Sequence, residues 1–127
     1  MITWDLKTVD VQPRAPQILA TNDSRAIIVN LPAGESMPDH QVHERAWITV
    51  VEGELEMTVI ASGESVKASA GHLFLFEPAE RHRVDAITDT RLLLLLAPWP
   101  GNGHPGATPL EAKAHASELA AEINGDG

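Results

Sequence analysis

The sequence predicts an all-β protein, a sandwich or barrel of short strands followed by one α-helix near the C-terminus. Two observations support this prediction. From residue 25 onward, short runs rich in β-branched and aromatic residues are separated by turns that contain glycine or proline. After the last of these runs the pattern changes to one typical of a helix, with its own start and stop signals. The 127 residues suit a single domain.

The expected strands follow one another at short intervals. Residues 54–59 show the clearest pattern, because leucine, methionine and valine alternate with glutamate and threonine, so that one face meets a core and the other meets water. Gly53 marks the turn before this strand, and Ser62 and Gly63 fall where a two-residue hairpin loop is expected. The other strands are expected in "RAIIVNL", "AWITVVE", "ESVKASA", "HLFLFEP", "HRVDAI" and "TRLLLLLAP".

The run from Leu92 to Leu96 is apolar at every position, which indicates a strand that is buried on both faces. One face is expected to meet the barrel interior. The other face needs a cover, either the C-terminal helix or a second subunit. Ala46 is expected to face the interior, and alternation places Trp47 on the opposite face of the same strand. We therefore expect Trp47 to pack at an interface rather than to line the cavity.

The chain divides into four expected segments: an N-terminal arm (1–24), a barrel (25–97), a loop rich in proline and glycine (98–107) and a helix (108–124). Pro13 and Pro16 break any long regular element in the arm. The apolar residues that we expect to dock on another part of the protein, as an edge strand, are Trp4, Leu6, Val9 and Val11. Thr108 can cap the helix, Pro109 suits its first position, and Glu111 completes a capping box.

Composition excludes several classes of protein. The formal net charge is −9 and the basic residues are scattered, so we expect no binding of nucleic acid. The absence of cysteine excludes disulfides, thiolate metal sites and cysteine nucleophiles. We see no signal peptide and no apolar run long enough to span a membrane, and we therefore expect a cytoplasmic protein.

Two segments resemble the conserved motifs of the cupin superfamily. "GESMPDHQVHERAWITVVEGELEM" resembles the first motif, in which His40 stands at the first histidine position and Gly53 closes the motif. "GHLFLFEPAERHRVDA" resembles the second motif, which Gly71 opens and in which His82 falls at the histidine position. The resemblance covers residues 26–97 and implies a small single-domain jelly-roll barrel of the conserved-barrel type, commonly a homodimer.

The sequence departs from the family pattern where metal ligands are expected. Val42 replaces the second histidine of the first motif, and Ala46 replaces its glutamate. Ala86 replaces the asparagine of the second motif. By strict register, only His40 and His82 remain of the usual ligands.

Two histidines alone would hold a divalent ion weakly, because a catalytic site usually takes at least three protein ligands. His43 is the nearest third donor. Strict alternation places it on the face opposite His40, whereas a bulge between Gln41 and Arg45 would turn it inward. The resemblance therefore implies a metal site formed by His40, His43 and His82.

Other donors stay open. Glu44 could replace the missing carboxylate ligand, although a salt bridge to Arg45 or Arg81 explains it better. His72 follows the glycine that opens the second motif, and His104 lies in the loop after the barrel. Imidazole-rich sites suit zinc, nickel, iron, manganese or copper, so the identity of the ion also stays open.

The barrel interior is expected to form a small-molecule pocket. Alternation predicts that its walls include Ala46, Ile48, Val50, Leu55, Met57, Val59 and Val84. The function implied is a metal-binding cupin that acts on a small organic metabolite, with the metal held by histidines at the barrel mouth. The alternative is a non-catalytic binder or sensor of a small molecule, with a degenerate and metal-free site. A structural dimerisation domain is a third reading, and the residues do not decide between an enzyme and a binder.

Overall fold

In the computed structural model, residues 1–40 and 42–100 are described, and for residues 39 and 40 the description covers the backbone alone. The predicted helix at 108–124, most of the predicted loop and His104 lie outside the described residues. Within the described part, no helix is long and apolar enough to span a membrane.

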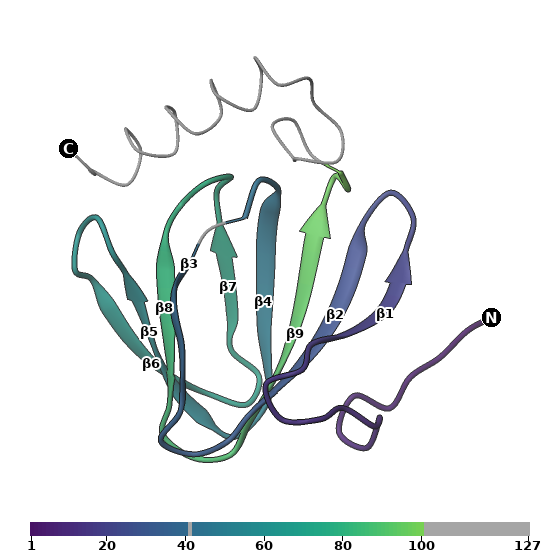
Figure 1. Cartoon of the computed structure of the whole chain (residues 1–127), viewed down its shortest axis with the longest axis horizontal. Coiled ribbons are helices and arrows are strands. Elements are labelled where there is room, and N and C mark those ends of the chain that lie inside the picture. The colour runs from purple at the N-terminus through teal and green to yellow at the C-terminus, as the bar shows by residue number, and fades with distance from the viewer. Residues whose placement is uncertain (41, 101–127) are drawn as a thin grey trace.

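The described residues form two antiparallel sheets that face each other, which confirms the predicted all-β jelly-roll fold (Figure 1). The five-stranded sheet has the order β1-β2-β9-β4-β7, and the four-stranded sheet has the order β3-β8-β5-β6. The strands are β1 (Gln17–Thr21), β2 (Arg25–Leu31), β3 (Ser36–His40), β4 (Arg45–Glu52), β5 (Glu54–Val59), β6 (Ser65–Ser69), β7 (Leu73–Phe76), β8 (His82–Ala86) and β9 (Thr90–Ala97).

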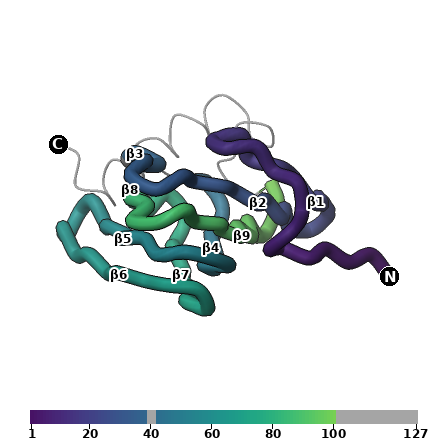
Figure 2. The backbone as a smooth tube through the Cα atoms, turned by 90° about the horizontal axis from the view of Figure 1, so that it is seen from below, coloured from purple at the N-terminus to yellow at the C-terminus, as the bar shows by residue number. Residues whose placement is uncertain are grey.

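The N-terminal arm contributes the edge strand of the five-stranded sheet. This strand is β1, which follows Pro16 and pairs with β2, whereas the apolar residues nearer the N-terminus form no strand. The earlier part of the arm lies alongside β2 and β9 (Figure 2). The guanidinium of Arg91 on β9 donates hydrogen bonds to the carbonyl oxygens of Leu6 at 3.0 Å and Val9 at 2.8 Å. Arg91 therefore holds two positions of the arm, Leu6 and Val9, against the barrel.

Alternation along the strands places one apolar face of each sheet in the interior. The interior core cluster consists of Val29, Leu31, Ala46, Ile48, Val50, Leu55, Met57, Ala68, Phe76, Val84, Ala86, Leu92, Leu94 and Leu96. The alternating pattern predicted for residues 54–59 is confirmed, because Leu55 is 0 % exposed and Met57 is 2 % exposed.

The other face of the five-stranded sheet is apolar as well. Leu95 on β9 lies opposite Trp47 on β4, and Trp47 lies opposite Leu75 on β7. These three side chains are 37 %, 37 % and 46 % exposed, and Leu73 beside them is 55 % exposed. We call Trp47, Leu73, Leu75 and Leu95 the outer apolar face. The apolar run on β9 is thus buried on one face, while the other face has no cover among the described residues.

Candidate functional site

His82 is a buried polar residue at the start of β8 and is 1 % exposed. Its Nδ1 lies 3.1 Å from the carbonyl oxygen of Glu80. A carbonyl oxygen only accepts hydrogen bonds, so Nδ1 carries a proton, and Nε2 is the nitrogen that can act as a ligand when the ring is neutral. The imidazole also stacks on Phe76 of β7, with ring centroids 4.1 Å apart and planes inclined by 15°. Because β7 and β8 belong to opposite sheets, the two rings meet across the barrel interior.

An irregular register in β3 brings residue 40 opposite His82. Met37 pairs with Val84 and His40 pairs with His82, so β3 takes three steps where β8 takes two. Cross-strand partners lie on the same face of a sheet. The extra residue therefore sets the backbone of residue 40 opposite that of His82. The irregularity lies before the segment 41–45, where the sequence predicted a bulge.

The loop between β3 and β4 places a carboxylate on the interior side. Glu44 is 1 % exposed, and it shares the inward alternation of Ala46, whereas Arg45 between them is exposed. His43 is half-buried. The carbonyl oxygen of Val42 accepts a hydrogen bond of 2.7 Å from the N–H of Ala79, which joins this loop to the turn after β7. Among the described residues of this loop, 42–44, Glu44 is the one that is buried.

Arg45 forms an ion pair with Glu77 rather than with Glu44. Its Nη2 lies 2.8 Å from Oε2 of Glu77. The hydrogen bond from Arg45 holds the pKa of the Glu77 carboxyl below its ordinary value. Both side chains are well exposed, so the pair contributes little to stability. Arg45 is therefore the partner of Glu77, and a salt bridge between Glu44 and Arg81 stays a prediction.

Comparison with known proteins identifies the fold family. Residues 27–98 match the family model described as the cupin domain. The chain belongs to the cupin family. No curated protein matches the chain.

Several solved structures share this fold. The structure of KdgF from a Halomonas species is 29 % identical, with 70 % of this chain and 84 % of that chain covered and a TM-score of 0.60. An RmlC-like cupin protein from Desulfovibrio desulfuricans is 20 % identical, with 77 % and 98 % covered and a TM-score of 0.67. The Cnp3 cupin domain of Schizosaccharomyces pombe is 19 % identical, with 76 % and 74 % covered and a TM-score of 0.68. The last two likenesses show the fold alone.

In this cupin, His72 does not join the residues around His82. It is exposed, and its carbonyl oxygen accepts a hydrogen bond of 2.9 Å from the N–H of Val50, near the end of β4 that lies away from Glu44. Among the side chains that the structure describes, which do not include that of His40, no three His, Asp or Glu residues are close enough to share a metal ion. A metal site at this end of the cupin barrel therefore needs at least one ligand beyond the described side chains, and His40 is the first candidate.

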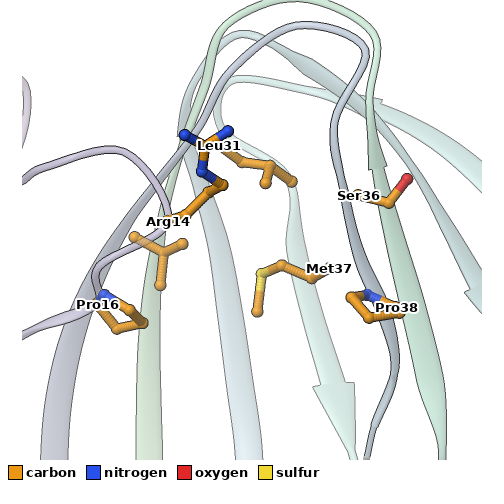
Figure 3. Close-up of a pocket in the computed structure, with 7 residues that line it drawn as sticks. Arg14, Pro16, Leu31, Ser36, Met37 and Pro38 are labelled. Carbon is orange, nitrogen blue, oxygen red and sulfur yellow. The ribbon is translucent and has the colours of Figure 1, made fainter.

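The predicted pocket walls of this cupin pack together as part of the hydrophobic core. Of the predicted wall residues, all but Val59 belong to the packed core cluster, and Val59 packs against it. A pocket of about 370 Å³ lies instead between the arm and strands β2 and β3 (Figure 3). It is lined by Arg14, Pro16, Val29, Leu31, Ser36, Met37 and Pro38. None of the predicted wall residues lines this pocket.

Proposed function

We propose that this cupin binds a divalent metal ion through His40 and His82 and acts on a small organic metabolite at that ion. The observation that carries the proposal is the setting of His82. A metal-ligating histidine almost always donates its other ring N–H to a carbonyl or carboxylate, which fixes the tautomer and the ring orientation. The Nδ1 contact with Glu80 does this for His82 and leaves Nε2 as the ligand nitrogen. The register with residue 40 supports a second imidazole on the same face.

The third ligand is His43 or Glu44. Burial favours Glu44, because Glu44 is 1 % exposed whereas His43 is only half-buried. Two imidazoles and one carboxylate form a donor set that suits zinc, manganese, iron, nickel or copper. When bound, the ion would supply Lewis-acid chemistry and orient the metabolite. The residues of the chain would hold the ion, and Phe76 would fix the plane of the His82 ring.

Metal uptake by untagged protein tests this proposal. After removal of metals with a chelator, we expect roughly one ion per chain to rebind when zinc, manganese or nickel is added. Because only the folded state holds the site, the thermal midpoint should rise, as expected for a gain of about 2.7 kcal/mol at a hundredfold excess over Kd. Glu44→Gln and His43→Ala, compared side by side, identify the third ligand. A protein that stays metal-free by elemental analysis, with an unchanged midpoint, would refute the proposal.

A second candidate function is a non-catalytic binder or sensor of a small molecule. The observation that favours it is the incomplete ligand set, since Val42 and Ala46 stand where the second histidine and the glutamate of the family motif are expected. A thermal-shift screen with metals and metabolites separates the two functions. A response to metabolites alone favours the binder, and a response that requires metal favours the enzyme. The cytoplasmic location expected from the sequence stays a prediction under either function.

We also propose that the protein is a homodimer that packs through the outer apolar face. Large apolar side chains that adjoin on the surface of a soluble protein usually mark an interface. Trp47 lies in the middle of this face, between Leu75 and Leu95, and aromatic residues at the centre of an interface contribute most to its stability. A two-fold axis through the face would place two copies of Trp47 against each other.

Replacing Trp47 with glutamate should convert this dimer into a monomer. A charge at the centre of an apolar interface stays unpaired and desolvated on association, so the dimer is strongly disfavoured. Analytical ultracentrifugation measures the mass of each species. Lys67→Glu, an exposed change on β6 of the other sheet, is the control and should leave the mass unchanged. A monomeric wild-type protein, or a Trp47→Glu variant that remains dimeric, would contradict the assignment.

A further inference from the structure

The pocket between the arm and the barrel has walls from three elements. Pro16 comes from the arm, Val29 and Leu31 come from β2, and Met37 and Pro38 come from β3. The side chain of Met37 reaches from β3 into the space that faces the arm (Figure 3). The volume of about 370 Å³ lies near the lower end of the range for small-molecule sites, about 300–1,000 Å³.

Arg14 supplies the one charged side chain among the described residues that line this pocket. Its guanidinium lies beside Leu31 at one end (Figure 3). It forms an ion pair with Glu35 through Nη1. A guanidinium has five N–H donors, and the side chain of Arg14 is 66 % exposed, so the remaining donors are accessible to a second acceptor. The hydroxyl of Ser36, the other polar lining group, already donates to Asp85.

The backbone holds Arg14 in a fixed and uncommon conformation. Its φ is 61°, in the left-handed region that residues other than glycine rarely adopt. Its N–H donates to the carbonyl oxygen of Asn30 at 3.1 Å, and Pro13 forms a bridge with the same residue. Strain of this kind persists only where the surrounding structure enforces it, and it concentrates at functional sites. The backbone therefore sets the point at which the Arg14 side chain leaves the arm, beside an apolar pocket.

We propose that this pocket binds a small apolar monocarboxylate, with its carboxylate on the guanidinium of Arg14 and its hydrocarbon part between Pro16, Leu31 and Met37. The site is separate from the metal site proposed above and does not use His82. A planar guanidinium matches the two oxygens of a carboxylate, and the apolar walls match a short aliphatic or aromatic chain.

Binding of octanoate tests this site, with octanol and octylamine as ligands of similar length and different charge. The chain has three methionines, so ¹³C-methyl labelling gives a small set of resolved signals. Octanoate should shift the methyl signal of Met37 and leave that of Met57, which is buried in the core. Octylamine should not bind, and octanol should bind up to about fivefold more weakly, the largest ratio expected from loss of one exposed charge contact. Equal binding of octanol and octanoate, or no shift of the Met37 signal, would overturn the proposal.

Arg14→Gln should weaken octanoate binding by up to about fivefold while the protein stays folded, because the side chain is exposed. Arg45→Gln removes a comparable exposed arginine that is also paired with one glutamate, and it should leave octanoate affinity unchanged. Met37→Trp, which fills the pocket, should abolish binding. If Met37→Trp does not fold, Arg14→Gln and Arg45→Gln still test the proposal. Equal octanoate affinities of these two variants would overturn it. His82→Leu should retain octanoate binding, so failure of the metal site and failure of this pocket are distinguishable.

Discussion

Replacing Gly53 with alanine is expected to destabilise the protein by about 2–5 kcal/mol, a large part of the roughly 5–15 kcal/mol that usually separates folded from unfolded chains. A Cβ at this position would lie 2.1 Å from the carbonyl oxygen of Asp89 and 2.9 Å from the Cα of Thr90. Both contacts are with backbone atoms, which cannot rotate away. The φ of Gly53 is +89°, so alanine would also be strained in its own backbone.

The neighbourhood of Gly53 gives the backbone no room to shift. The N–H of Glu54 donates to the hydroxyl of Thr88 at 2.8 Å, and the N–H groups of Ile87 and Thr88 donate to the carbonyl oxygen of Glu54. The hydroxyl of Thr90 donates to the same carbonyl at 3.1 Å. These bonds join the β4–β5 turn to the β8–β9 turn, so a displacement of one turn would break contacts with the other.

Gly63→Ala is the matched control for this prediction. Gly63 also has a positive φ, +73°, but a Cβ there would meet no atom within 4 Å. It should therefore cost only the backbone strain, about 1 kcal/mol. Urea unfolding of both variants, followed by circular dichroism, gives the two free energies. Similar losses in both would show that the contact with Asp89 is not the cause.

The sequence predicted strands well where a local pattern records which face is buried. Residues 54–59 alternate strictly, and the structure buries Leu55 and Met57 as expected. The edge strand was predicted in the wrong part of the arm, before Pro13 rather than after Pro16. Strand β1 forms because it pairs with β2, and the two nearby prolines gave no local sign of a strand there. Periodicity in the sequence indicates which face of a strand is buried. It does not indicate which neighbouring strand a short segment will pair with.

The candidate site was predictable only in part. The motif resemblance indicated His82, and the structure places it inside the barrel. The extra residue between Met37 and His40, which sets residue 40 opposite His82, has no sequence signal beyond an interrupting proline. Likewise, period-2 alternation identified interior positions such as Ile48 without telling whether their side chains leave a hollow, since that depends on how both sheets pack. The pocket beside Arg14 was missed because its walls come from three separate segments.

Replacing His82 with leucine should abolish metal binding while the barrel remains folded. Leucine has a similar volume and suits the apolar surroundings of a residue that is 1 % exposed. The substitution leaves the carbonyl oxygen of Glu80 without the Nδ1 donor, which costs about 1–3 kcal/mol, and burial of an added aliphatic group offsets about 1.5–3 kcal/mol. The metal-free variant should therefore unfold within about 2 kcal/mol of the metal-free wild type.

The decisive comparison is the stability gained on adding metal. Wild-type protein should gain stability in proportion to the logarithm of metal concentration above Kd, and His82→Leu should gain none. His72→Gln is the control, because His72 is exposed at the other end of β4 and should keep the full gain. If His82 served the fold alone, its replacement would lower stability equally with and without metal and would leave metal uptake intact. The two roles of this buried imidazole, a ligand or a packed ring on Phe76, thus predict different responses to the same titration.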